Sequence, residues 1–172
     1  GSGDVSPSAR AYVDPLVVND TMRVKARILA EGGWSASSEA AFVVSSPTDA
    51  LQITEIMYHP VDGSNYEFVE LHNAGEFTID LSGLFFDEGI TFEFPRETTL
   101  QAGDYLVLAS NGDAFLSRYP GVAVGGIFDG ALANEGEKIT LKSPQNDTVL
   151  TVDYGDEGFW PLGPDGFGYS LV

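Results

Sequence analysis

Three glutamates in two apolar segments have the spacing best suited to acid–base or binding chemistry in this sequence. Glu55 lies in one apolar run, and Glu67 and Glu70 follow in the next. Side chains alternate between the two faces of a strand, so Glu67 and Glu70 are predicted to lie on opposite faces unless a bulge intervenes. Glu70 shares the face of Phe68 and is expected to be buried and hydrogen-bonded, with Glu55 in the same environment. A structural polar network is the favoured interpretation; a binding site at Glu55 and Glu70 is the alternative, and catalysis is the least favoured.

Further acids gather in the predicted loops. Carboxylates in loops are the oxygen ligands that Ca²⁺ prefers, although none here follows the spacing of an EF-hand. Acidic loops more often face water, so we expect no cofactor, and calcium is the alternative. The candidate calcium ligands are Asp87, Glu88, Asp153 and Asp156.

A glycine-rich segment near the C-terminus carries several aromatic side chains. Aromatic faces bind sugar rings through apolar contact, which makes carbohydrate one candidate ligand. The favoured interpretation is structural, with Trp160 closing one end of the folded domain. The candidate binding residues are Trp160, Phe167 and Tyr169, close to Phe159.

Motifs for catalysis are missing from the sequence. The two histidines, His59 and His72, have no third metal ligand at a recognisable spacing, and there is no cysteine. Neither the Gly-x-Ser-x-Gly nucleophile motif nor the Gly-x-x-x-x-Gly-Lys phosphate-binding motif occurs. We therefore predict that the protein is not an enzyme.

The charge of the chain is unevenly distributed. The 172 residues carry a net charge of −18. Most of this charge comes from residues 47–172, which contain 4 basic and 21 acidic residues. Such a surface repels phosphate backbones and anionic lipids, which argues against nucleic acid as a partner. No apolar run approaches the roughly 18 residues that a membrane-spanning helix needs, so we predict no membrane insertion.

The elements that position these residues are predicted to be short β-strands. Apolar residues alternate with polar ones throughout, turns recur at short intervals, and no helix of normal length is indicated. The segment 105–109 is almost continuously apolar, as in a central strand buried on both faces. This pattern predicts an all-β, immunoglobulin-like β-sandwich with an extra N-terminal hairpin. Strands are expected at 21–30, 39–44, 51–58, 66–73, 77–81, 84–86, 90–94, 105–109, 126–128, 138–142 and 149–154, with one helical turn at 113–119.

The polar, proline-containing segment 45–49 predicts a boundary between two regions, 1–46 and 47–172. The first region begins with Gly1-Ser2-Gly3, which we interpret as an expression scar. The rest of it is short for a complete β-domain. Its two strands should therefore pack on the sandwich or pair between chains, because a lone hairpin exposes both edges.

Six segments of the second region carry recognisable motifs in a consistent order. They are Ile-Thr-Glu-Ile-Met-Tyr-His-Pro at 53–60, Glu-Phe-Val-Glu-Leu-His-Asn at 67–73, Ile-Asp-Leu-Ser-Gly-Leu at 79–84, the run 92–108, Leu-Ala-Asn-Glu-Gly-Glu at 132–137 with its following strand, and the Trp-Pro and Gly-Tyr-Ser-Leu elements of 160–171. Together they resemble the lamin tail domain, an immunoglobulin-like fold found in nuclear lamins and in exported bacterial proteins. Leu84 stands where that family usually has tryptophan.

The first region has a weaker resemblance. Tyr12 to Leu16, the strand around Val24, Trp34 and the run 41–44 are similar to the final strands of a chitobiase C-terminal, fibronectin-III-like domain. Only part of such a domain fits here.

These resemblances imply a non-catalytic interaction or spacer module of a larger secreted or cell-surface bacterial protein. Its expected partners are proteins or neighbouring domains of the same polypeptide, and oligomers through the N-terminal strands are an option. The alternative is an accessory domain that positions a neighbouring hydrolase and binds calcium or carbohydrate. The parent protein's sequence would distinguish the two.

Overall fold

The computed structural model describes residues 9–18, 22–42 and 46–172. Residues 1–3, interpreted from the sequence as an expression scar, and the segment 43–45, predicted as strand end and linker, lie outside the described residues. Two compact units are present: the first comprises Gly1–Ser45 and the second comprises Ser46–Val172. Among the described residues, no helix is long and apolar enough to cross a membrane.

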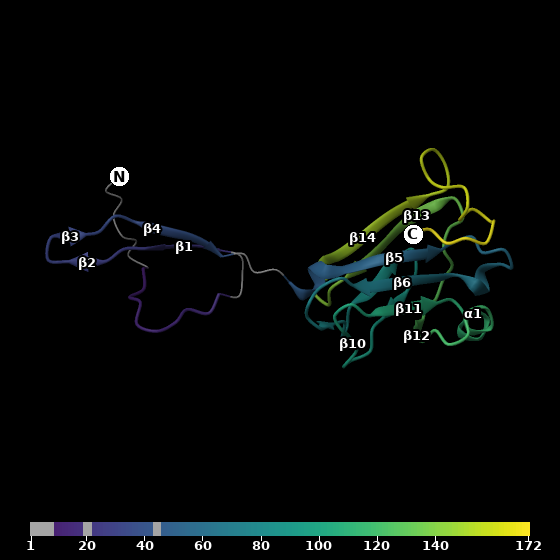
Figure 1. Cartoon of the computed structure of the whole chain (residues 1–172), viewed down its shortest axis with the longest axis horizontal. Coiled ribbons are helices and arrows are strands. Elements are labelled where there is room, and N and C mark those ends of the chain that lie inside the picture. Colours follow the sequence, from purple (N-terminus) through teal and green to yellow (C-terminus); the bar gives the residue numbers. More distant parts are fainter. Residues whose placement is uncertain (1–8, 19–21, 43–45) are drawn as a thin grey trace. The chain divides into compact units, whose positions relative to one another are not determined.

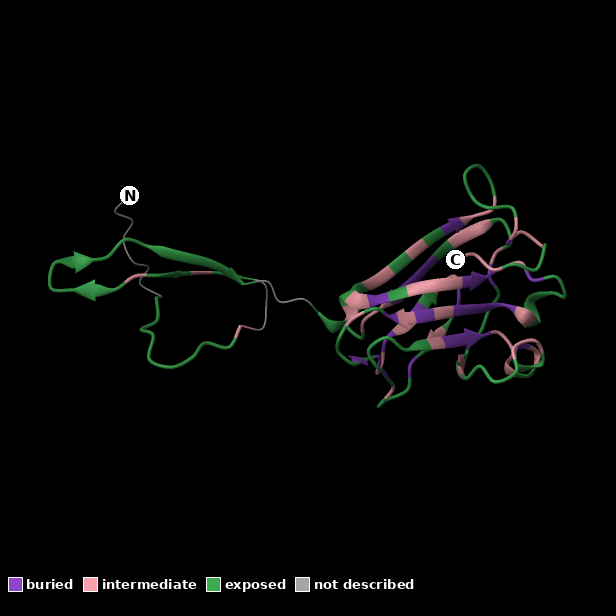
Figure 2. Cartoon of the chain, viewed as in Figure 1, coloured by how far each residue is buried: buried purple, intermediate pink, exposed green. Residues whose placement is uncertain are grey.

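The N-terminal unit is an interrupted β-hairpin (Figure 1). Strand β1 (Met22–Ala26) pairs antiparallel with β4 (Ser38–Phe42), and β2 (Leu29–Ala30) pairs with β3 (Gly33–Trp34). The single strand predicted at 21–30 is therefore broken after Ala26. None of the strand residues in this unit is buried (Figure 2).

The second unit is a β-sandwich of two four-stranded sheets. The first sheet has the order β12-β11-β6-β5, in which only β11 and β12 run parallel. The second has the order β14-β13-β8-β9, and all its neighbours are antiparallel. The strands are β5 (Leu51–Met57), β6 (Phe68–Asn73), β8 (Phe85–Glu88), β9 (Phe92–Glu93), β11 (Tyr105–Ala109), β12 (Val124–Ile127), β13 (Gly136–Lys142) and β14 (Thr148–Gly155).

Smaller elements complete this unit. Strands β7 (Ile79–Asp80) and β10 (Thr99–Leu100) form a separate antiparallel pair. Two 3-10 turns, η1 (Pro47–Ala50) and η2 (Ser64–Tyr66), precede β5 and β6. The helical turn predicted at 113–119 is the helix α1 (Gly112–Arg118), which begins because the Asn111 side chain accepts a hydrogen bond from the Ala114 N–H at 3.0 Å.

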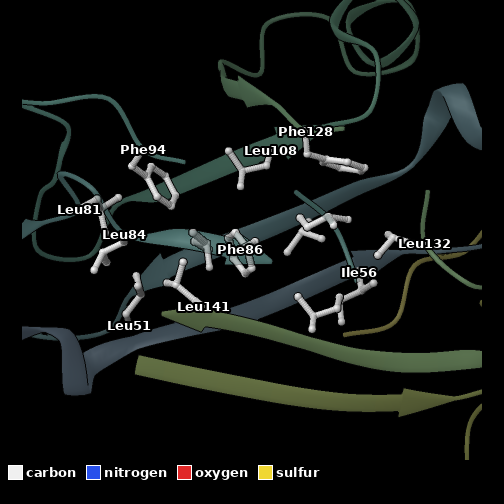
Figure 3. Close-up of a cluster of buried hydrophobic side chains, with 14 of the residues drawn as sticks. Leu51, Ile56, Leu81, Leu84, Phe86, Phe94, Leu108, Phe128, Leu132 and Leu141 are labelled. Atoms are coloured by element: carbon white, nitrogen blue, oxygen red, sulfur yellow. The ribbon is translucent and has the colours of Figure 1, made fainter. Parts of the chain in front are cut away.

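Apolar side chains from both sheets meet in one core between them (Figure 3). Strand β11 is buried on both faces, as its apolar sequence predicts. Leu108 lies in the main core, whereas Val107 and Ala109 pack beneath Phe115 of α1 in a second cluster. The all-β, immunoglobulin-like sandwich predicted from the sequence is confirmed.

Candidate functional site

The structure brings Glu55 and Glu70 together. A bulge between Ile53 and Glu55 sets Glu55 directly opposite Glu70 on the paired strands β5 and β6. Two like charges in this position destabilise a sheet, and each carboxylate has a hydroxyl donor that offsets the effect. Thr54 Oγ1 donates to Glu70 Oε1 at 2.8 Å, and Ser170 Oγ donates to Glu55 Oε1. Both glutamates are only partly buried, so the prediction that Glu70 is buried is wrong.

The buried glutamate is Glu67, whose side chain is 2% exposed. Its Oε2 accepts a hydrogen bond from the Leu132 N–H at 2.9 Å. Burial raises the pKa of Glu67 to about 7; the Leu132 N–H opposes this shift, and the charge of Glu137 adds to it. The signal that could have identified Glu67 is its position: it shares a face with Val69 and Leu71, which point into the main core. Glu70 shares the face of Phe68, which α1 covers only at the far end.

The four predicted calcium ligands are not brought together. Lys142 binds Asp87 at 2.8 Å and Lys138 binds Glu88 at 3.0 Å. Thr140 Oγ1 also donates to Glu88 at 2.6 Å, and this hydrogen bond, with the lysine beside it, lowers the pKa of Glu88. Within the described parts of the chain, no three acidic or histidine side chains are grouped so that they could hold a metal ion. The two remaining candidates, Asp153 and Asp156, lie near the end of β14.

Both histidines have partners. His59 Nδ1 lies 2.7 Å from Asp165 Oδ1, which joins β5 to the C-terminal segment 106 residues later. The His72 ring stacks on Tyr105 with 4.2 Å between centroids and 10° between planes. Both contacts are consistent with a structural role for these histidines, neither of which has a third metal ligand at a recognisable spacing in the sequence.

The C-terminal aromatic residues lie at the surface. Phe159, Phe167 and Tyr169 are each at least two-thirds exposed, and Trp160 is 38% exposed. Trp160 lies against the end of β14, where a Cβ added to Gly155 would approach the indole Nε1 to 2.9 Å. Trp160 therefore packs on the end of β14 with part of its ring exposed, and its closing of the sandwich stays a prediction; the buried aromatic pair in the core is Tyr58 with Tyr154, 4.8 Å apart.

The position of Trp160 predicts its fluorescence. Trp34 is the only other tryptophan, so the variant Trp34→Phe isolates the Trp160 signal. We expect a red-shifted emission maximum and strong quenching by neutral acrylamide, because more than a third of the side chain is exposed. A blue-shifted maximum with weak quenching would show instead that Trp160 is buried.

Most of the candidate polar residues described so far have partners within the protein. These are Glu55, Glu70, Asp87, Glu88 and both histidines.

Comparison with known proteins agrees with the fold. A search of curated proteins found no match. The family model of the lamin tail domain matches residues 44–156, which is well over half of the chain. The segment before residue 44 lies outside this match, so its similarity to a fibronectin-III-like domain stays a prediction, and so does the extension of the family pattern to residue 171. The chain belongs to the lamin tail domain family.

Proposed function

We propose that this chain is a non-catalytic interaction or spacer module of a larger secreted or cell-surface bacterial protein. The family assignment to an immunoglobulin-like domain supports this role, as do the engaged polar groups described above. The proposed module needs no cofactor. Calcium at the predicted ligands would have to displace Lys142 from Asp87 and Lys138 from Glu88.

The observation that carries the proposal is the position of the exposed apolar side chains. Large exposed apolar patches mark surfaces that contact other molecules. In the described residues, most such side chains belong to the hairpin unit or to the C-terminal segment 159–172. They are Tyr12, Val13, Leu16, Val17, Met22, Ile28, Leu29, Trp34 and Phe42 in the first group, and Phe159, Trp160, Leu162, Phe167, Tyr169 and Val172 in the second.

The hairpin needs a partner more than any other element does. An isolated two-stranded hairpin is marginally stable in water, and its strands have no buried residue. The face that carries Met22 and Val24 on β1 and Phe42 on β4 is the surface that a partner would cover. We propose that this partner is a neighbouring domain of the longer protein. The other outcomes are that the hairpin packs on the sandwich or pairs with the hairpin of a second chain.

Hydrogen–deuterium exchange tests this function. We expect residues 22–42 and 156–172 to exchange more slowly in the longer natural protein than in the isolated chain, because a neighbour covers them there. The strands β6 and β11 at the centre of the first sheet serve as the internal control and should not change. Equal exchange of all segments in both samples would rule out a neighbouring part of the longer protein as the partner. Light scattering with and without residues 1–46 separates pairing between chains from the other outcomes.

The second candidate function is an accessory domain that presents carbohydrate to a neighbouring hydrolase. The exposure of Trp160, Phe167 and Tyr169 favours it, because sugar-binding aromatic rings must be open to solvent. Titration of the Trp34→Phe variant with soluble polysaccharides tests this candidate. An unchanged Trp160 emission at saturating concentrations would exclude that residue as a sugar platform.

A further inference from the structure

Glu67 is the only buried carboxyl group among the described residues, and its role goes beyond the proposed function. It lies between η2 and β6, directly before Phe68. Its backbone carbonyl accepts hydrogen bonds from the N–H and hydroxyl of Ser110 at 3.0 and 3.2 Å. The main chain of Glu67 is therefore held in place, and only its side chain is left to respond to ionisation.

The side chain of Glu67 holds a loop. Its carboxyl group binds the N–H of Leu132, in the segment 128–135 that connects β12 to β13. The Leu132 side chain is 4% exposed and belongs to the main core (Figure 3). Two glycines with positive φ, Gly130 at 98° and Gly136 at 103°, flank this contact. The loop thus has a buried anchor between two residues whose backbone tolerates large changes of φ.

The titratable groups around Glu67 are all acids. Glu137 Oε1, on β13, accepts a hydrogen bond from the Ala133 N–H at 2.7 Å. The Tyr154 hydroxyl, on β14, lies 2.8 Å from the Ala133 carbonyl oxygen and 3.1 Å from Glu137 Oε1. From the end of β5, Tyr58 packs on Tyr154, and its buried hydroxyl has no hydrogen-bond partner among the described residues.

Beyond this cluster, the charges of Asp156 and Asp165 act on Tyr58. Among the described residues, the charged side chain that acts on the Glu67 carboxyl group is Glu137, and the charge of Glu67 itself adds to the effects that raise the pKa of Tyr154. A negative charge on Glu67 is therefore opposed by burial and by the charge of Glu137.

We propose that Glu67 and the loop around Leu132 form a pH-sensitive latch: protonated Glu67 holds the loop closed, and ionised Glu67 favours its opening. When the loop opens, water reaches the carboxylate and the charge is no longer buried beside Glu137. Both glycines then permit the backbone to move without a steric penalty at Cβ.

The direction of the pH effect follows from linkage. In the closed loop burial holds the pKa of Glu67 at about 7, whereas a solvated carboxyl has its ordinary value of 4.5. The closed form therefore retains its proton between these two values and is favoured at the lower pH. We expect the opening equilibrium constant to increase about 100-fold as pH rises from 4.5 to 8, and then to level off.

Amide exchange of the loop tests the latch. In the unmodified protein, protection of residues 129–135 should fall between pH 5 and pH 8 by about two orders of magnitude after correction for the intrinsic exchange rate. Glu67→Gln retains an oxygen that can accept from the Leu132 N–H but cannot ionise, so its corrected protection should not vary with pH. The matched control Glu70→Gln makes the same change three residues along β6 and should behave like the unmodified protein.

Two outcomes would overturn the proposal. One is a pH dependence that persists in Glu67→Gln, and the other is constant protection of the loop in the unmodified protein. A measurement that needs no variant covers the case in which Glu67→Gln does not fold: a carbon-13 titration of the Glu67 carboxyl group by NMR. A midpoint near 7 supports the latch, and one near the ordinary value of 4.5 refutes it.

Discussion

Replacing Asn73 with alanine is expected to destabilise the sandwich by about 3 kcal/mol. Asn73 is fully buried at the end of β6 and makes three side-chain hydrogen bonds. Its Nδ2 donates to the carbonyl oxygens of Phe77 and Leu100 at 2.8 and 2.9 Å, and its Oδ1 accepts from the Gly75 N–H at 3.0 Å. Alanine leaves all three backbone groups without this partner, and an unsatisfied buried group costs roughly 1–3 kcal/mol.

Urea denaturation followed by circular dichroism measures this loss as a lower transition midpoint with an unchanged slope. The control is Asn134→Ala, which alters an exposed asparagine in a loop. We expect it to change the free energy of unfolding by less than about 0.5 kcal/mol. A loss below 1 kcal/mol for Asn73→Ala would contradict the view that this side chain organises the turn after β6.

Replacing Gly136 with alanine is expected to be more damaging still, at about 3–5 kcal/mol. Gly136 begins β13 opposite Gly155 on β14, with φ at 103°. A Cβ at this position would lie 2.4 Å from the Tyr154 carbonyl oxygen and 2.6 Å from the Gly155 Cα. Both obstacles are backbone atoms, so the strands themselves must separate, and the strained φ adds a further cost.

Gly121→Ala is a matched control because it has the strained φ of Gly136→Ala without the clash at Cβ. Gly121 has a φ of 92°, but a Cβ there meets no atom within 4 Å. The free energy of unfolding of this variant should fall only by the cost of the positive φ for alanine, about 1 kcal/mol. Thermal unfolding of both variants isolates the steric contribution as their difference. Equal losses would show that the strand pairing at Gly136 tolerates a side chain.

Local sequence patterns were sufficient for most of the strands. The apolar run 105–109 is the strand β11 with the same bounds, and alternation identified β5, β6, β13 and β14 to within two residues of their ends. Burial on both faces leaves few polar residues in a strand, and burial on one face leaves an alternating pattern. These signals come from neighbouring residues, so they are readable without the fold.

The candidate site was less predictable, because its contacts join residues far apart in the chain. Ser170 donates to Glu55 across 115 residues, and no periodicity near Glu55 indicates this partner. The lysines that bind Asp87 and Glu88 come from β13, about fifty residues later. The sequence predicted loop acids that face water, with calcium binding as the alternative, whereas strand pairing placed a lysine beside two of them.

The sequence by itself determined the all-β class, the lamin tail family and the strongly acidic character of the sandwich. The tertiary structure alone decided which glutamate is buried. Alternation put Glu67 and Glu70 on opposite faces correctly, but both faces of β6 carry apolar residues. Burial depends on what packs on each face: the Leu132 loop binds Glu67, whereas Glu70 stays partly buried beside Thr54. That difference in packing raises the pKa of Glu67, whereas Glu70 is only partly buried.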